Sequence, residues 1–239
     1  MNEERIPEEI AFVDFRCPHC GNPCSFPESW IGRAQECPTC WQILIVPGKG
    51  VDLGAKLPLP YKTLRLLLRR LLPMDSSDLL EIASDKDLLR YVEWDPIDAQ
   101  QEVDEWLAND REARLFQQKH NFYMALELLG QPKVIGYVAL AYLNSDNSEM
   151  YTNLIVNRAY HRQGFGTESV RGAMYLAFKC LNIRRLCAWC DCRNIAAARM
   201  FEKAGLRREG RFIKERFYKG EWVDSFQFAL LKEEYVSAS

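Results

Sequence analysis

The stretch from Leu154 to Glu168 constrains the fold most, because it joins three kinds of local structure. An apolar run ends at Val156, glycines follow at 164 and 166, and a long amphipathic pattern begins after them. This order predicts a strand, a glycine turn and a helix. The first N–H groups of a helix lack partners within it, and glycine lets the backbone approach a ligand closely. With the helix dipole added, the stretch predicts a phosphate or pyrophosphate site; the alternative is a loop that needs glycine only to turn.

Motif spacing, composition and charge disfavour several classes of function. The glycine spacing matches neither G-x-G-x-x-G nor G-x-x-x-x-G-K-[ST], which disfavours both nucleotide-binding patterns. An apolar fraction of 48% with 27% charged residues is typical of a globular protein. No apolar run approaches the roughly 18 residues of a membrane span, and the first residues are acidic, so we expect a cytoplasmic protein without a membrane segment. The net charge of −2 does not favour bulk binding of nucleic acid.

The nine cysteines are odd in number and clustered, which indicates metal ligands and reduced thiols. Two C-x2-C pairs lie in the first forty residues, and we predict that all four bind one zinc ion: Cys17, Cys20, Cys37 and Cys40. His19 and Cys24 lie close by but are not expected to be ligands. Cys187 and Cys190 are three apart in a predicted strand, so they point to opposite faces and are expected to be buried thiols.

The cysteine-rich segment is too short to fold on an apolar core alone, so metal binding is expected to supply its folding energy. It resembles the small bacterial zinc ribbons that precede many unrelated domains. A stretch rich in glycine and proline follows. We therefore predict a zinc ribbon over residues 1–47, a linker over 48–61 and a larger domain over 62–239.

The larger domain alternates between strand and helix patterns. Strands are predicted over residues 63–72, 122–129, 134–142, 149–156, 184–192, 212–218 and 222–231. Helices are predicted over residues 74–83, 98–107, 167–181 and 195–204. Asn194 is a suitable N-cap for the last helix, and Gly205 a suitable end.

Several motifs occur in an order that resembles the GNAT superfamily of N-acetyltransferases over residues 62–235. They are Thr63-Leu-Arg-Leu with Asp75, Val134-Ile-Gly136, the glycine stretch, Asn194-x-Ala-x-x-x-x-Phe-Glu-Lys-x-Gly205, and Gly220-x-Trp-x-Asp224. The resemblance is strongest to the branch with the ribosomal-protein N-terminal acetyltransferases. It implies an α+β fold with a central mixed sheet flanked by helices.

The same resemblance implies acetyl-CoA as cofactor. Backbone groups of the glycine loop would hold the pyrophosphate, and the strand before it would pair with the pantetheine arm. The implied cofactor residues are Leu154, Ile155, Val156, His161, Arg162, Gln163, Gly164, Phe165, Gly166, Thr167 and Asn194. His161 replaces the Arg or Gln of the family motif, and Arg158 its usual proline.

The implied reaction is direct attack of an amine on the thioester, without a covalent intermediate. The family's proton donors are absent, because Phe201 and Ala197 stand at their positions. We name Glu149 as candidate base and Tyr218 as candidate acid; the alternatives are a solvated strand-end carboxylate and a packed aromatic. A thiol with a pKa near 8.5 can leave as the thiolate with little help from a proton donor. Alternatively, water delivers the proton.

The acceptor is inferred from charge alone. Acidic residues outnumber basic residues between 62 and 110, on helices that border the acceptor groove in this family. This indicates a cationic amine, such as a protein N-terminus, a polyamine or an aminoglycoside; the alternative is a solvated acidic face. Two other functions stay open: a CoA-binding regulatory protein without turnover, and docking of a protein, nucleic acid or the ribosome by the ribbon.

Overall fold

The computed structural model describes residues 12–17, 19–30, 34–46, 59–116, 121–144 and 148–235. The chain divides into two compact units, Met1–Pro58 and Leu59–Ser239. Most of the linker predicted over 48–61 lies outside the described residues. No helix in the described part of the chain is long and apolar enough to cross a membrane.

The first unit consists of two small antiparallel sheets. Strand β1 (Phe12–Arg16) pairs with β2 (Pro23–Pro27), and β3 (Ala34–Glu36) pairs with β4 (Ile43–Ile45). A 3-10 turn, η1 (Glu28–Trp30), follows β2. The buried core of the first unit comprises Cys17, Cys24, Phe26, Cys37, Leu44 and Val46. Half of that core is cysteine, so the unit depends on its sulfur atoms for internal packing.

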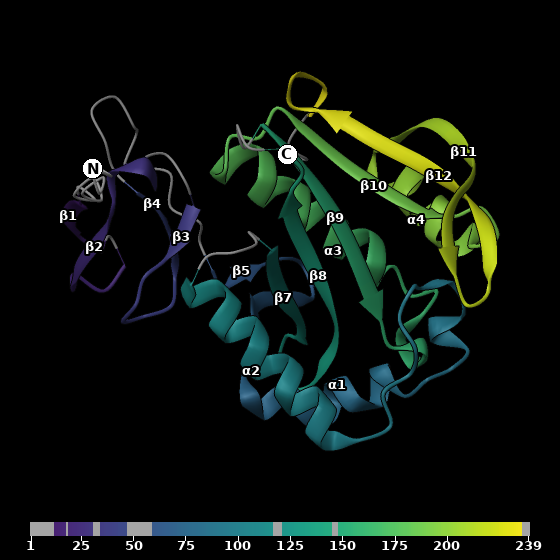
Figure 1. Cartoon of the computed structure of the whole chain (residues 1–239), viewed down its shortest axis with the longest axis horizontal. Coiled ribbons are helices and arrows are strands. Elements are labelled where there is room, and N and C mark those ends of the chain that lie inside the picture. Colours follow the sequence, from purple (N-terminus) through teal and green to yellow (C-terminus); the bar gives the residue numbers. More distant parts are fainter. Residues whose placement is uncertain are drawn as a thin grey trace, which may run out of the picture. The chain divides into compact units, whose positions relative to one another are not determined.

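The second unit is built on an eight-stranded sheet in the order β11-β12-β10-β9-β8-β7-β6-β5 (Figure 1). Its strands are β5 (Tyr61–Lys62), β6 (Leu66–Arg70), β7 (Asn121–Leu128), β8 (Val134–Tyr142), β9 (Glu149–Val156), β10 (Arg185–Asp191), β11 (Arg207–Tyr218) and β12 (Glu221–Leu231). Strands β9 and β10 form a parallel pair, and the other neighbours in the sheet are antiparallel. This is the mixed sheet that the sequence predicts.

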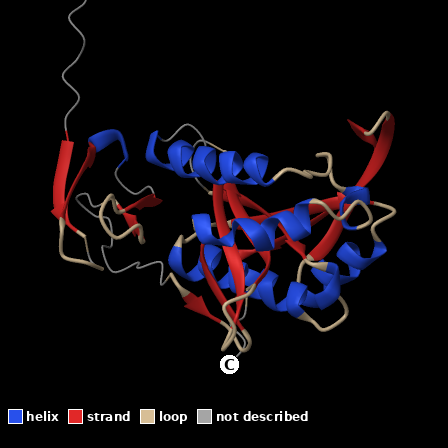
Figure 2. Ribbon diagram, turned by 90° about the horizontal axis from the view of Figure 1, so that it is seen from below, coloured by secondary structure: helices blue, strands red, loops and turns tan. Residues whose placement is uncertain are grey.

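Helices lie on both sides of the strands (Figure 2). They are α1 (Ser76–Ala83), α2 (Gln100–Phe116), α3 (Phe165–Tyr175) and α4 (Ile195–Ala204). Ile155 of β9 packs in one apolar cluster with residues of α1 and α2. Its neighbour Leu154 points the other way, toward Gly166 of α3. Side chains alternate along a strand, so odd residues of β9 face α1 and α2, and even residues face α3.

Short helical turns complete the second unit. The 3-10 turns are η2 (Pro73–Asp75), η3 (Leu88–Tyr91), η4 (Arg158–Tyr160) and η6 (Lys232–Glu234). A π-helical turn, η5 (Leu176–Cys180), extends α3. The turn between β11 and β12 has positive φ at Lys219 and Gly220, as two-residue hairpins require.

Two elements are longer than the sequence patterns predict, and both are strongly polar. Helix α2 extends to Phe116, well beyond the predicted end at residue 107. The sequence pattern missed the second half of this helix because that half is rich in polar and charged residues. Strand β11 begins at Arg207, not at residue 212. It is an edge strand, exposed along most of its length, so it shows no apolar alternation to mark its start.

Strands β8 and β9 approach most closely at Gly136. A Cβ atom built there would lie 2.2 Å from the carbonyl oxygen of Ile155 and 3.0 Å from the Cα of Val156. Both contacts are with backbone, which cannot rotate away as a flexible side chain would. Gly136 therefore fixes the spacing of β9, the strand that leads into the glycine loop.

We expect Gly136→Ala to lower the free energy of unfolding by about 1–3 kcal/mol, because the new methyl group forces the two backbones apart. Urea denaturation measures the change. Gly210→Ala is the matched control: its Cβ would meet the Phe212 ring at an ordinary 3.5 Å. Equal losses in the two variants would contradict this interpretation.

Candidate functional site

The glycine loop forms the start of α3 as the sequence predicts. Gly164 is the N-cap, with φ of 86°, a conformation that glycine adopts without strain. The first hydrogen bond within the helix runs from Glu168 N–H to the carbonyl of Gly164 at 3.0 Å. The N–H groups of Phe165, Gly166 and Thr167 precede it and have no acceptor inside the helix. The loop thus presents several backbone donors at a helix N-terminus, the geometry of an anion site.

Glu168 braces this loop against the entry to β6. Its carboxylate accepts hydrogen bonds from Thr63 Oγ1 at 2.5 Å and from Arg65 N–H at 2.7 Å, and it pairs with the Arg65 guanidinium at 2.8 Å. The guanidinium also donates to the carbonyl of Gln163 at 2.9 Å and lies 4.1 Å from the centre of the Phe165 ring. We did not predict these contacts of Glu168. The sequence feature that could have indicated them is a glutamate in the first turn of α3, where a capping carboxylate is favoured.

The loop side chains are used mainly to hold the backbone in shape. The Nε2 atom of His161 lies 2.8 Å from the carbonyl oxygen of Val156. Gln163 Nε2 donates to the carbonyl of Ala159 at 3.2 Å. Arg162 has a φ of 60°, which aids the sharp turn. What the loop offers a ligand is therefore chiefly its row of N–H groups.

A fork in the sheet lies beside this loop. Strands β9 and β10 pair only through residues 149–151 and 185–187, although β9 continues to Val156 and β10 to Asp191. Figure 1 shows the two strands running together at one end and diverging toward the other. On its far side β9 stays paired with β8. The edge of residues 154–156 that faces β10 is thus left without a strand partner.

The two sides of the fork end in different predicted site residues. Leu154, Ile155 and Val156 lead from β9 toward the glycine loop. Strand β10 leads to Asn194, which caps α4: its side-chain oxygen accepts the N–H of Ala197 at 3.0 Å. Phe201 is 3% exposed and packs against Phe228, so it belongs to the core.

The two candidate catalytic residues each have another partner. Glu149 lies at the paired end of β9 in an ion pair with Arg184, about 23 Å from Val156 at roughly 3.3 Å per strand residue. Tyr218 donates its hydroxyl to the carboxylate of Asp191 at 2.5 Å. Burial and that carboxylate raise the pKa of Tyr218 well above its usual range. The roles assigned to them stay predictions, and this geometry weighs against both.

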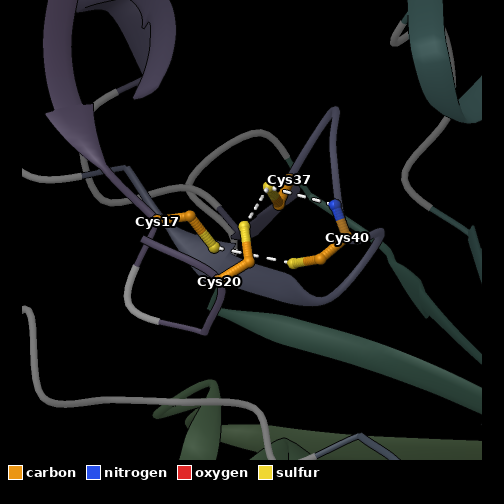
Figure 3. Close-up of side chains that lie close together, drawn as sticks. All are labelled: Cys17, Cys20, Cys37 and Cys40. Atoms are coloured by element: carbon orange, nitrogen blue, oxygen red, sulfur yellow. Dashed lines mark hydrogen bonds between the residues drawn. The ribbon is translucent and has the colours of Figure 1, made fainter. Parts of the chain in front are cut away.

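The four predicted metal ligands lie together in the first unit. Their sulfur atoms lie within 4.8 Å of one another, and Figure 3 shows them turned toward a common centre from two turns. The Cys17–Cys40 and Cys20–Cys37 sulfur pairs are each 3.7 Å apart. Four thiolates about 2.3 Å from one zinc ion would be about 3.8 Å apart, so the arrangement fits tetrahedral zinc.

The two cysteine turns have matching backbone geometry. Cys17 N–H donates to the carbonyl of Asn22, and Cys37 N–H donates to the carbonyl of Gln42. Positive φ follows each pair, at Gly21 (74°) and at Trp41 (64°). His19 is not part of the sulfur cluster.

Cys24 is a fifth sulfur close to this cluster. Its sulfur lies 3.8 Å from that of Cys37 and is buried, yet it is not among the four that converge. Cys24 is therefore a neighbour of the cluster, and its exclusion from the ligand set stays a prediction.

The brace at Glu168 makes stability depend on pH. Burial by itself would raise the pKa of this carboxyl, but the bonds from Thr63 and Arg65 outweigh it and hold the pKa below its usual range. A lowered pKa stabilises the fold above about pH 4.5, and the contribution is lost as the pH falls through the folded-state pKa. We expect Glu168→Gln to cost about 2 kcal/mol at pH 7 and less at pH 3.5, below the ordinary pKa of the carboxyl.

Urea unfolding at both pH values measures this difference. Glu202→Gln is the control: this carboxylate pairs with Arg208 at the surface and is 43% exposed, so its removal should change little. A loss for Glu168→Gln that is the same at both pH values would show that the charge of Glu168 has no part in it.

Comparisons with known proteins agree with this architecture. The model of the acetyltransferase (GNAT) domain matches residues 65–207. The uncharacterised N-acetyltransferase YnaD of Bacillus subtilis (strain 168) is 28% identical over 179 residues, which cover 72% of this chain and 97% of that protein.

Two solved structures have the same fold. A GNAT-family acetyltransferase from Bacillus anthracis matches with a TM-score of 0.65 at 24% identity, over 72% of this chain and 98% of its own. A spermidine N-acetyltransferase from Vibrio cholerae, in complex with CoA and spermine, matches with a TM-score of 0.61 at 21% identity, over 71% of this chain and 96% of its own. With the family model matching most of the second unit, the chain belongs to the GNAT family of acetyltransferases.

Proposed function

We propose that this protein transfers an acetyl group from acetyl-CoA to a primary amine by direct attack in a ternary complex. Family membership supports the transferase activity and acetyl-CoA as the donor. The observation that carries the proposal is the glycine loop beside the fork between β9 and β10. A site for phosphate and an unpaired strand edge would then lie next to each other. This suits acetyl-CoA, a long molecule with a charged pyrophosphate and an amide-containing pantetheine arm.

Each part of this arrangement has a distinct task. The N–H groups of residues 163–167 would hold the pyrophosphate, with Arg65 and Glu168 keeping the loop in place. The edge of residues 154–156, which has no strand partner and of which only the Val156 carbonyl is contacted by His161, would pair with the pantetheine arm as a strand does. A backbone N–H on that edge would polarise the thioester oxygen. Bound acetyl-CoA supplies the activated acetyl group, and the fork orients it.

Proton transfer in this chain relies little on side chains. The amine must be neutral to attack, yet Glu149 is held by Arg184, and Asp191 by Arg193 and Tyr218. A thiolate with a pKa near 8.5 would gain little from Tyr218, whose pKa is far higher. We infer that the amine loses its proton to solvent and that the thiolate leaves with little assistance.

For the first unit we propose a structural zinc ion bound by Cys17, Cys20, Cys37 and Cys40. The spacing of the sulfurs supports it, as does the small core, which is half cysteine. All four positions of a tetrahedron are taken by protein, as in structural zinc sites. Docking of a protein, nucleic acid or the ribosome by this unit stays a prediction, as does a cytoplasmic location.

We expect Gly164→Ala to weaken acetyl-CoA binding at least tenfold, measured by isothermal titration calorimetry, because the side chain strains the turn that aims the N–H groups. Gly205→Ala is the matched control: it also has positive φ at a helix end but lies outside the loop. If both variants lose similar stability but only Gly164→Ala loses affinity for acetyl-CoA, the result supports a pyrophosphate site at the glycine loop. Unchanged affinity in Gly164→Ala would exclude it.

We expect one zinc ion per chain in the purified protein, and less than a tenth of that in Cys37→Ser, by elemental analysis. Acetyl-CoA affinity should be unchanged, because the ligands belong to the other unit. Cys192→Ser is the control, a cysteine of the second unit that should leave the zinc content intact. A wild-type protein without zinc, purified without chelator, would rule out the ion.

A further inference from the structure

Asn153 occupies the mouth of the fork on the face of α1 and α2. It lies on β9 two residues beyond the last residue paired with β10, on the same face as Tyr151 and Ile155. Its cross-strand neighbour on β8 is the small residue Ala139. An amide side chain therefore stands where the sheet opens, beside a position that offers little bulk.

The orientation of Asn153 is supported by neighbouring aromatic rings. Tyr151 stacks on Trp189 of β10, with ring centroids 3.9 Å apart. The amide of Asn153 lies within hydrogen-bonding reach of the Tyr151 hydroxyl. The guanidinium of Arg216 lies 5.0 Å from the Trp189 ring. These contacts from β9, β10 and β11 fix Tyr151, which in turn positions the amide.

Two polar atoms of this cluster are buried without a hydrogen-bond partner among the described residues: Asn153 Oδ1 and Trp189 Nε1. An orphaned buried polar atom is unfavourable unless a ligand or water satisfies it. Oδ1 is an acceptor, so its missing partner is a donor such as an amine N–H. Nε1–H is a donor, so its missing partner is an acceptor such as a carbonyl oxygen.

Ion pairs neutralise part of the acidic charge that suggested a strongly cationic acceptor. Half of the acidic residues between 62 and 110 that suggested one are bound in ion pairs: Asp75 with Arg69, Asp78 and Glu81 with Lys133, Asp85 and Asp87 with Arg158, and Glu93 with Arg216. Near Trp189, Glu93 and Glu215 both pair with Arg216. Asn153 itself is neutral at every pH.

A site that receives the amine with the neutral amide of Asn153 selects amines by their basicity. A peptide α-amine, with a pKa near 7.8, is about one-third neutral at pH 7.5, whereas an alkylamine with a pKa near 10.4 is neutral in roughly one molecule in 800. Only the neutral form donates an N–H to Asn153 and still attacks. A peptide α-amine also has a carbonyl group close by, which a polyamine lacks.

From these observations we propose that Asn153 Oδ1 receives the acceptor amine and that the acceptor is a peptide or aminoacyl α-amine. This rests on the proposed acetyltransferase function. The nitrogen forms a bond to the acetyl carbon, the carbon–sulfur bond breaks, the thiolate leaves with its electron pair, and the amine's extra proton passes to water.

The test uses the full chain with acetyl-CoA at pH 7.5 and three acceptors: alanyl-alanine amide, Nα-acetyl-lysine amide and spermidine. We expect kcat/KM for the dipeptide amide to exceed that for the other two by about 100-fold. Asn153→Leu should raise KM for the dipeptide amide about tenfold and leave acetyl-CoA affinity unchanged. Asn153→Asp adds a carboxylate at the same place and should narrow the preference for the α-amine at least tenfold.

Thr152→Val is the matched control. Thr152 also has a buried hydroxyl without a partner among the described residues, but it faces α3. It should leave KM for every acceptor unchanged. Equal rates with the lysine derivative and the dipeptide, or an unchanged KM in Asn153→Leu, would overturn the inference. Failure of the wild-type protein to bind acetyl-CoA would instead remove the proposed function on which it rests.

Discussion

The parallel pairing of β9 with β10 is the constraint on which the second unit depends. Parallel neighbours need a crossover, and here α3 and η5 supply it, so the chain leaves β9 through the glycine loop. The pair ends after three residues on each strand. That early end leaves backbone groups of β9 unpaired beside the same loop. One topological feature thus places a helix N-terminus and an open strand edge side by side.

Ion pairs stabilise the glycine loop and the neighbouring part of the sheet. Arg65 and Glu168 hold the loop to the entry of β6, and Arg69 joins β6 to Asp75 and Glu127. Ion pairing also changes the interpretation of the acidic residues between 62 and 110, because carboxylates that bind arginine or lysine are not available to a cationic acceptor. The polar atoms without partners at the fork are uncharged, and they are what directs our inference toward a neutral amine.

The first unit follows a different physical rule. Its buried core includes three cysteines beside three apolar side chains, and its two turns bring four sulfurs to tetrahedral spacing. A segment of this size cannot offset its chain entropy by apolar burial alone. Cys17 and Cys37 belong both to the buried core and to the cluster of four sulfurs, and the spacing of two short cysteine motifs was sufficient to predict that cluster.

The sequence determined those features that depend on neighbours in the chain. It predicted the two cysteine turns, the cap at Asn194, the glycine start of α3 and the strands of the mixed sheet, because these follow from local spacing and turn chemistry. It did not reveal the polar half of α2 or the first part of β11, whose sequences show no apolar period. Only the tertiary structure paired Glu149 with Arg184 and Tyr218 with Asp191, and only it left Asn153 Oδ1 without a hydrogen-bond partner among the described residues. The partner of a charged or polar side chain is chosen by which strands lie side by side, and that choice is made across the whole sheet.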